Sequence, residues 1–486
     1  MRDHLFDLAV VGAGPAGLSA AVTAAEAGLD VALVDAGRQT GGQFWRHPDE
    51  RHLEGFADDE STGHHHWERF RDLRARLAAC VQAGSIAHVA ERQVWRADDD
   101  GETVRLATAP VAGRDAREPA DREIRARRLL LATGAYDRQL PVPGWTLPGV
   151  MAAGGVQALV KAHQVRAGRR AVVAGTGPFL LSVAAGLAKA GVEVVAVCDA
   201  NALSRWAATP LRAVQEPGKL VEGVEYAATM LRHRIGFHTR TIVSEIRGSS
   251  RAEQVVLQKV DARGRAVPGS ERTVEADLVA LGWGFTPQLE LAVGLELDTR
   301  VDEDGSLVVA AGSDQRTSSP RVYAAGETTG IGGAVQSCAE GELAALSVAA
   351  DLGGHADPRR AARLRRRVAR GRRFAVGMHR ASPIPADWSQ WLRPSTTVCR
   401  CEEVTAAEVE ETIVDLAADD ARDVRVTARP GMGWCQGRVC GFAVSKLVER
   451  SSGCAASAAD LEPLSKRPIG APVRLGDIAD LGAGRP

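Results

Sequence analysis

Short apolar runs and longer stretches of helical periodicity alternate in two separate parts of the chain. Between residues 7 and 35 an apolar run, an alanine-rich stretch and a second apolar run follow one another, and the same order returns between residues 170 and 200. Runs of this length, separated by helical patterns, are typical of parallel strands joined by helices. The pattern therefore predicts two α/β domains.

The turn after the first run carries the spacing G-x-G-x-x-G, formed by Gly12, Gly14 and Gly17. In a dinucleotide site the first glycine permits the tight turn, the second lets a pyrophosphate approach the backbone, and the third lets helix and strand pack closely. The helix N-terminus then faces the phosphates. Asp35 ends the second apolar run and can bond ribose hydroxyls. Strand, helix, strand and acid in register predict a dinucleotide site.

A second glycine-rich segment lies far downstream. A short apolar strand over residues 322–325 is followed by Gly326 and Glu327, and a helix is expected to begin near Gly333. This layout resembles the second FAD motif of flavoproteins with two dinucleotide-binding domains, where an acid bonds the ribityl chain and a helix N-terminus points at the flavin. That family usually has Asp where this chain has Glu327, so the charge is kept on a longer arm.

Two further segments belong to the FAD site that this resemblance implies. Gly42 and Gln43 lie in "TGGQFWR", shortly after the first motif. Thr133 and Gly134 lie in "LLLATGAYDR", which fits the return strand of the same domain. The predicted cofactor is therefore FAD.

The second repeat departs from a nicotinamide site. Gly175 and Gly177 are present, but Leu180 takes the third glycine position, and Ser182 stands where nicotinamide-binding relatives usually carry Glu. Leu180 is expected to push the helix from the strand or crowd the phosphates. Two interpretations stay open: a scaffold without a nucleotide, or a site for NAD or another nucleotide. Asp199 at the strand end would favour NAD over NADP.

Four of the eight cysteines form two pairs near the end of the chain. The spacing is C-x-C, then thirty-three residues, then C-x4-C, and the residues are Cys399, Cys401, Cys435 and Cys440. By contrast, Cys80, Cys198 and Cys338 are isolated, which disfavours a redox disulfide beside the flavin and predicts small buried residues instead.

Each cysteine pair is predicted to precede a helix. Thr405 and Glu408 form a capping box before an apolar periodicity, which places the first pair in a loop ahead of that helix. The second pair lies in "WCQGRVCGFAVSKLVERS", near the start of another helix. Free N–H groups at helix N-termini favour thiolates, so the four sulfurs are predicted to converge on a metal centre.

Three identities remain open for this centre. Structural zinc sites usually use C-x2–4-C pairs, and a [4Fe–4S] cluster would show C-x2-C-x2-C, which the chain lacks. The order C-x-C then C-x4-C resembles the [2Fe–2S] module of bacterioferritin-associated ferredoxin. A [2Fe–2S] cluster is the favoured prediction, with zinc or no metal as alternatives.

The chain as a whole resembles a known family. The segments that carry the resemblance are "PVPGWTLPGVMAAGG", "LGWGFTPQLELA", "AAGETTGIGGA" and "GMGWCQGRVC". They are similar to the alpha or A subunits of multi-subunit FAD-dependent amino-acid and opine dehydrogenases, a family that includes opine oxidase, hydrogen cyanide synthase and hydroxyproline dehydrogenase. The resemblance implies an electron-transferring subunit paired with an amine-oxidising flavoprotein (beta or B) subunit. A small ferredoxin-like subunit is a further candidate partner.

Two other functions stay open at this point. One is a self-contained NADH-dependent reductase of a ferredoxin-like acceptor, which would need a working site at Gly175. The other is a non-enzymatic assembly module that holds zinc. No Ser-His-Asp, Cys-His or paired-carboxylate set stands out, so no acid–base catalytic residue is predicted.

The predicted fold class is α/β: a two-dinucleotide-binding-domain flavoprotein of the glutathione or thioredoxin reductase type, with a small C-terminal helical [2Fe–2S] module. The expected divisions are 1–150 with 277–352 (FAD domain), 151–276 (second domain), 353–394 (basic connecting helix), 395–455 (cysteine module) and 456–486 (tail).

Charge and hydropathy add little further. The net charge is −1, so bulk charge gives no sign of a nucleic-acid partner. No signal peptide and no apolar run long enough for a membrane span is found, which predicts a cytoplasmic protein and leaves peripheral membrane association open. The stretch after Asp357 carries nine arginines and predicts either a solvated connecting helix or a surface for a partner subunit.

Overall fold

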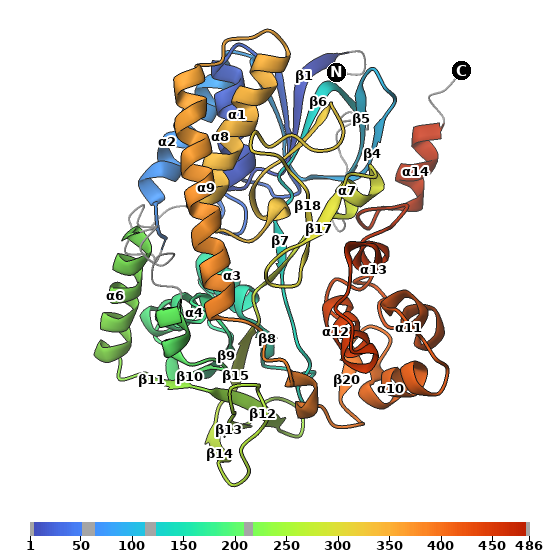
Figure 1. Cartoon of the computed structure of the whole chain (residues 1–486). Coiled ribbons are helices and arrows are strands. Elements are labelled where there is room, and N and C mark those ends of the chain that lie inside the picture. The colour runs from blue at the N-terminus through green and yellow to red at the C-terminus, as the bar shows by residue number, and fades with distance from the viewer. Residues whose placement is uncertain (1–3, 51–63, 112–122, 209–216, 483–486) are drawn as a thin grey trace.

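The computed structural model describes residues 4–50, 64–111, 123–208 and 217–482. Two domains built on parallel sheets are stacked along the molecule, and a small helical module lies beside them (Figure 1). Within the described ranges, no helix combines the length and apolar character needed to cross a bilayer.

The first domain has a seven-stranded sheet with the order β3-β2-β1-β6-β5-β4, and β19 pairs with β6. The strands β3, β2, β1, β6 and β19 are parallel, and β4 and β5 form an antiparallel extension. Its elements are β1 (Leu5–Val11), α1 (Pro15–Glu26), β2 (Val31–Val34), α2 (Trp67–Gln82), β3 (Ile86–Val89), β4 (Arg92–Asp99), β5 (Val104–Pro110), β6 (Glu123–Leu131), β19 (Val322–Ala324) and α8 (Ala334–Asp351).

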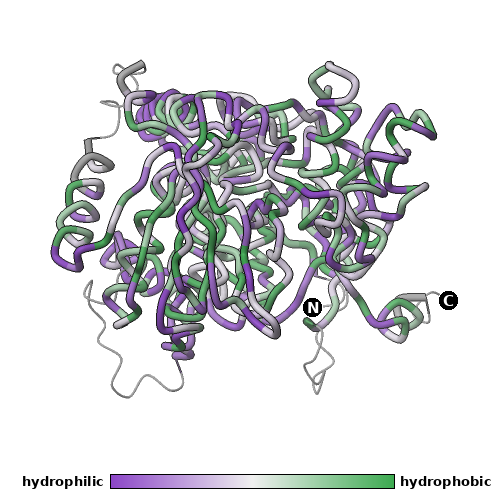
Figure 2. The backbone as a smooth tube through the Cα atoms, turned by 90° about the horizontal axis from the view of Figure 1, so that it is seen from below, coloured by the Kyte–Doolittle hydropathy of each residue, from purple (hydrophilic) through white to green (hydrophobic). Residues whose placement is uncertain are grey.

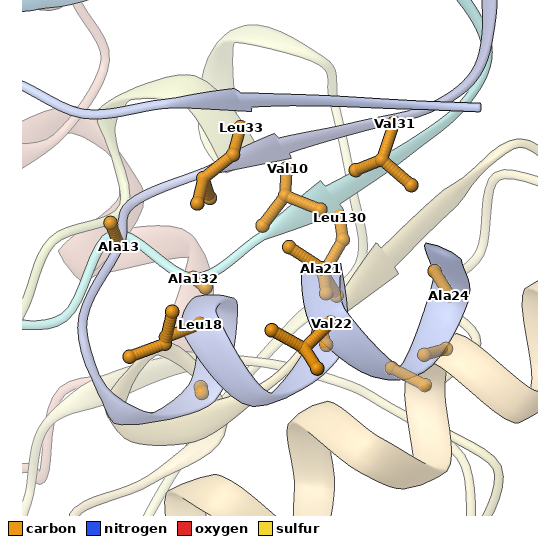
Figure 3. Close-up of a cluster of buried hydrophobic side chains, with 14 of the residues drawn as sticks. Val10, Ala13, Leu18, Ala21, Val22, Ala24, Val31, Leu33, Leu130 and Ala132 are labelled. Atoms are coloured by element: carbon orange, nitrogen blue, oxygen red, sulfur yellow. The ribbon is translucent and has the colours of Figure 1, made fainter. Parts of the chain in front are cut away.

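The core of this domain lies between α1 and the sheet. Val10, Val31, Leu33 and Leu130 point from three neighbouring strands toward Leu18 and Val22 of the helix (Figure 3). Each of these side chains is fully buried. Small residues elsewhere on α1 let α8 pack against it closely, so the chain segment near residue 340 completes the domain that residue 5 begins.

The second domain has a five-stranded parallel sheet with the order β11-β10-β9-β15-β8. A three-stranded antiparallel sheet, β12-β13-β14, is attached to it. The elements are β8 (Val150–Ala152), α3 (Ala153–His163), β9 (Arg170–Gly175), α4 (Phe179–Lys189), β10 (Glu193–Asp199), α6 (Pro217–Arg232), β11 (Gly236–Thr239), β12 (Thr241–Arg247), β13 (Gln254–Lys259), β14 (Arg272–Glu275) and β15 (Leu278–Gly282). Figure 2, in which the backbone is coloured by residue hydropathy, shows hydrophobic residues gathered in the interior of the molecule.

The chain passes between the two domains twice, and the two connecting segments pair as a small two-stranded sheet. β7 (Ala135–Asp137) leaves the first domain and pairs antiparallel with β16 (Phe285–Pro287), which returns to it. The return is followed by α7 (Glu290–Gly294), β17 (Thr299–Val301) and β18 (Leu307–Val309).

The arginine-rich segment forms α9 (Pro358–Ala381), which packs against α8. Asp357 caps its N-terminus by accepting a hydrogen bond from the Arg359 amide at 2.8 Å. Arg372 turns inward from this helix and forms an ion pair with the fully buried Glu340 at 2.6 Å. Its guanidinium also donates to the carbonyls of Gly326 and Gly330, so α9 stabilises the second glycine-rich segment.

The C-terminal module contains β20 (Thr397–Cys399), β21 (Val404–Thr405), α10 (Ala406–Val414), α11 (Ala421–Ala428) and α12 (Gly441–Ser452). The capping box of Thr405 and Glu408 is present as predicted. The tail then returns to the first domain through α13 (Ala458–Leu461) and α14 (Leu475–Gly482). There the Gly470 amide donates to the Trp95 carbonyl at 2.8 Å.

The pair of Glu340 and Arg372 gives a stability prediction. Glu340→Gln removes the buried charge and leaves Arg372 without its counterion, so the free energy of unfolding should fall by about 3 kcal/mol. Glu303→Gln is the matched control, because Glu303 pairs with Arg380 of the same helix on the surface; its loss should leave the free energy of unfolding nearly unchanged. Equal losses in denaturant unfolding would contradict the role given to the buried pair.

Candidate functional site: a dinucleotide turn and a four-cysteine centre

The predicted phosphate turn has the close contacts that require glycine. Gly12 has φ +103°, and a Cβ there would lie 2.3 Å from the Ala132 carbonyl oxygen. A Cβ on Gly17 would lie 1.7 Å from the Gly12 carbonyl oxygen. These contacts hold the start of α1 against β1 and leave the first-turn amides of the helix for an anion.

Asp35 lies beside this turn at the end of β2, as predicted. Its carboxylate accepts hydrogen bonds from the amides of Ala13 and Gly37. Burial raises the pKa of Asp35, and the two amides partly offset that effect. The acid is thus fixed where a ribose would lie in a dinucleotide site.

The segment containing Gly42 and Gln43 closes over the turn. The Gly41 amide donates to the Ala13 carbonyl at 2.9 Å, and a Cβ on Gly42 would lie 2.8 Å from the Gly14 Cα. Gln43 is exposed beside it. Gly14 itself is not crowded, since a Cβ added there would make only a van der Waals contact, 3.9 Å from the Gly42 Cα.

Thr133, Gly134 and Glu327 lie at the ends of neighbouring strands in the same sheet. The Thr133 hydroxyl donates to the Gln288 carbonyl at 2.8 Å, and the Gln288 amide donates to the Gly134 carbonyl. Glu327 accepts from the Gly333 amide, just ahead of α8, at 2.9 Å. Burial raises the pKa of Glu327, while the Gly333 amide and Arg372 favour its charged form. The residues predicted from the sequence therefore gather at one edge of one sheet. Their carboxylates, together with the amides of the glycine turn, fit the ribose, ribityl and phosphate groups of FAD.

The second glycine turn differs from the first in shape. Helix α1 begins at Pro15, directly after an extended Gly14, whereas α4 begins one position later in the motif, at Phe179. Gly177 has φ +89°. Leu180 is buried between α4 and the sheet, with its Cδ2 only 3.1 Å from where a Cβ on Gly282 would lie. Leu180 therefore packs into the core of the second fold, at the motif position where Gly17 meets the Gly12 carbonyl in the first.

The chain's own backbone crosses the crevice of this second fold. The Thr176 hydroxyl donates to the Ser382 carbonyl at 3.2 Å. Asn201 donates to the Thr176 hydroxyl at 2.6 Å and to the Pro383 carbonyl at 2.9 Å. Asp199 accepts from the Asn201 amide at 2.8 Å. The segment after α9 therefore bonds to residues at the carboxyl ends of β9 and β10, where a dinucleotide lies in such folds, and competes there with NAD.

The four predicted cysteines come together, and each interacts with at least one cysteine of the other segment. Cys399 interacts with Cys440, and Cys401 interacts with Cys435. No three His, Cys, Asp or Glu side chains in the described ranges converge on a single metal position. The geometry is two facing pairs, one thiol of each pair from each loop.

Cys399 and Cys440 form a buried inner pair. Cys399 and Cys440 are 1% and 3% exposed. The Cys440 thiol donates to Cys399, which lowers the pKa of Cys399 to about 5 and raises that of Cys440. The Gly431 amide also donates to the Cys399 sulfur at 3.4 Å. One thiolate is therefore stabilised before any metal binds.

Local structure around the cysteines differs in part from the sequence expectation. Cys399 ends the strand β20, so only Cys401 lies in the loop. Cys440 is the N-cap of α12, whereas Cys435 lies in the turn before it. The loops meet at Gly433, where a Cβ would lie 2.4 Å from the Cys401 Cβ. Glycine in "GMGWC" is needed for this approach.

Trp145 of "PGWTLPGV" contacts the first cysteine loop. Its indole Nε1 donates to the Thr397 carbonyl at 2.7 Å, and the Arg400 guanidinium lies 5.2 Å from its ring. Of the three isolated cysteines, Cys198 and Cys338 are buried as predicted and Cys80 is half-buried.

A family comparison agrees with the first site. Residues 6–350 match the model of the pyridine nucleotide-disulphide oxidoreductase family. The chain belongs to this family. Its members share the two-domain flavoprotein fold described here, and FAD is the cofactor that both the family and the residues of the first turn support.

Curated relatives extend the match over nearly the whole chain. The A subunit of opine oxidase from Agrobacterium tumefaciens is 33% identical, covering 98% of this chain and 92% of its own. The HcnB subunit of hydrogen cyanide synthase from Pseudomonas aeruginosa is 32% identical, covering 91% and 93%. The alpha subunit of sarcosine oxidase from Corynebacterium sp. is 29% identical over 60% of this chain but only 27% of its own length. The predicted resemblance to the A-type subunits is confirmed.

Solved structures support the fold. The L-proline dehydrogenase of P. horikoshii has a TM-score of 0.67 at 19% identity, covering 98% of this chain and 79% of its own. The thioredoxin reductase of T. acidophilum has a TM-score of 0.51 at 21% identity and covers 72% of this chain. The predicted flavoprotein fold class is confirmed.

The uncrowded position of Gly14 gives a direct test of the first site. Gly14→Val should leave the fold intact, because an added Cβ meets no protein atom closer than 3.9 Å. It should lower FAD affinity at least tenfold, because the side chain enters the path of the pyrophosphate. Gly186→Val is the control, since Gly186 has open space and lies away from the turn. Stoichiometric FAD in a folded Gly14→Val protein would place the cofactor elsewhere.

The filled crevice of the second fold gives another test. NADH should reduce the flavin slowly or not at all, because the Ser382 and Pro383 carbonyls already bind the residues that would hold it. Stopped-flow absorbance of the FAD-loaded chain with NADH measures this. Fast bleaching would show that the segment leaves the crevice and would revive the reductase alternative.

Proposed function

We propose that this chain is the FAD- and [2Fe–2S]-containing electron-transfer subunit of an oxidoreductase complex that oxidises an amino acid or an opine-type secondary amine. The observation that carries the proposal is the placement of two facing thiol pairs against a flavoprotein body. When bound, FAD supplies two-electron chemistry and a [2Fe–2S] cluster supplies one-electron steps.

The order of the four cysteines favours two irons over one zinc. A single zinc ion needs all four sulfurs at about 2.3 Å from one point. A [2Fe–2S] cluster instead takes two cysteines on each of two irons. The order C-x-C then C-x4-C, which resembles the [2Fe–2S] module, supports the second arrangement, and Cys399 and Cys440 would enter it as the buried side.

The chain's own residues prepare this centre in three ways. Cys399 has a lowered pKa, and metal ligands must be deprotonated. The Gly431 amide offers a hydrogen bond to that sulfur. Burial of Cys399 and Cys440 limits water access on the inner side, while the exposed Cys401 leaves the outer side open to a partner.

The relatives' names support the complex and the substrate class. The relatives from opine oxidase, hydrogen cyanide synthase and sarcosine oxidase are each named as one subunit of the enzyme. We infer that this chain likewise works with a second, amine-oxidising flavoprotein subunit, and that a small ferredoxin-like subunit is a further candidate. The self-contained NADH reductase is disfavoured by the filled crevice at Thr176.

Metal analysis tests the centre. The purified chain should contain about two irons and matching acid-labile sulfide per FAD. Cys435→Ser should lose iron and keep FAD, because the two sites lie in different parts of the fold. Cys454→Ser is the control: Cys454 is exposed and lies outside the four cysteines, so iron should be retained. Stoichiometric zinc without iron would support the assembly-module alternative.

Substrate assays test the division of labour. The isolated FAD-loaded chain should not oxidise amino acids or opines. Its described residues form two nucleotide-binding folds and a cysteine module, and among them we identify no site for an amine substrate. Co-purification from the native host should bring a second flavoprotein subunit that restores turnover. Oxidation of an amino acid by the chain alone would contradict its proposed role as one part of a complex.

A further inference from the structure

A buried ionic cluster joins the second cysteine loop to the flavin domain. It consists of Tyr136, Glu290, Arg438 and Arg467, and is called the Glu290 cluster below. Three contacts converge on Glu290 Oε1: hydrogen bonds from Tyr136 Oη at 3.2 Å and Arg467 Nη1 at 2.7 Å, and an ion pair with Arg438 Nε at 2.8 Å. The glutamate side chain is only 5% exposed.

Both arginines also hold the loop's backbone. Arg438 lies between the two cysteines of C-x4-C and donates to the Cys435 carbonyl at 3.3 Å and to the Gly470 carbonyl at 2.6 Å. Arg467 donates to the Gln436 carbonyl and, at 2.7 Å, to the Leu464 carbonyl. The peptide units on both sides of Gln436 are thereby tied to a buried carboxylate of another domain.

The other end of the cluster lies beside the flavin-site residues. Tyr136 accepts a hydrogen bond from Arg438 Nε at 2.8 Å and belongs to β7, two residues after Gly134. Glu290 begins α7, two residues after Gln288, which bonds both Thr133 and Gly134. Tyr136 and Glu290 therefore each lie two residues from Gly134 or Gln288, whose backbones bond to each other beside the predicted FAD site.

The charged groups of the cluster are buried, so its ion pairs are costly to break. The Arg438 and Arg467 side chains are 16% and 6% exposed and that of Glu290 is 5% exposed, so the opposite charges meet away from water. Burial lowers the pKa of Arg467 and raises that of Tyr136. Breaking a buried ionic cluster leaves uncompensated charge, so such contacts are costly to open. A surface arginine pair in the same module, Arg429 with Glu402, has no comparable burial.

We propose that the Glu290 cluster fixes the distance and orientation of the Cys435 loop relative to the flavin site, with Arg438 as a positioning residue for electron passage between them. The inference rests on the proposed function for the electron-passage part. The structural part, that the cluster holds the loop on the flavin domain, stands without any metal. Arg438 needs its planar fork for these separate acceptors, and lysine cannot reproduce that geometry.

Hydrogen exchange of the full-length chain tests the structural part. Arg438→Lys and Glu290→Gln should each speed amide exchange in residues 431–440 at least tenfold. Arg429→Lys is the matched control, since it makes the same change in the same module at a solvent-facing pair, and exchange should stay within twofold of the parent chain. Tyr136→Phe removes one hydroxyl and keeps the fold should the charge variants unfold; it should show a smaller increase in the same segment. Exchange in the Arg438→Lys or Tyr136→Phe chain equal to that of Arg429→Lys would overturn the proposal.

Rapid-mixing spectroscopy of the same chains tests electron passage. Arg438→Lys should keep its FAD and iron but pass electrons from flavin to the cysteine centre at least tenfold more slowly than Arg429→Lys. An unchanged rate with faster loop exchange would overturn the role in electron passage. A parent chain that lacks iron would instead refute the proposed function, and the exchange data would still decide whether the cluster holds the loop.

Discussion

The close approach of two cysteine loops at Gly433 is the constraint on which the rest of the C-terminal structure depends. Any larger residue would place its Cβ 2.4 Å from the Cys401 Cβ. With glycine there, the first segment brings Cys399 and Cys401 against Cys435 and Cys440 of the second segment. The module has its own small core, which includes Cys399 and Cys440, and contacts with neighbouring parts of the chain fix where the two cysteine segments lie on the body.

Those neighbours are drawn from the flavoprotein body. Trp145 holds the first loop through the Thr397 carbonyl, and the Glu290 cluster holds the second through the Cys435 and Gln436 carbonyls. The Arg138 guanidinium adds a third contact, 4.0 Å from the Phe442 ring of α12. The module is thus docked on the two-domain body by polar contacts at defined backbone groups. An electron carrier benefits from such docking, because its distance to the flavin is then set by the fold.

The sequence was most informative where local backbone geometry decides the residue. The G-x-G-x-x-G turn, the acid Asp35 and the capping box at Thr405 could each be predicted, because their partners lie nearby in the chain or in a regular repeat.

Contacts between distant segments could not be predicted in this way. The Ser382 and Pro383 carbonyls fill the second crevice, but nothing in their own sequence marks them, since backbone carbonyls are present everywhere. Glu290 and Arg467 are 177 residues apart, and each resembles an ordinary surface charge in the sequence. Arg372 likewise lies in a strongly basic helix, and only the fold separates the one arginine that meets Glu340 from its surface neighbours.

The four cysteines are proposed to hold a [2Fe–2S] cluster, and electron paramagnetic resonance of the reduced chain tests this most directly. After chemical reduction of the purified full-length protein, a two-iron cluster held by four cysteines gives a signal from about one unpaired electron per chain. We expect that signal, and we expect Cys435→Ser to abolish it while FAD is retained. A reduced chain with no cluster signal and stoichiometric zinc would contradict the account.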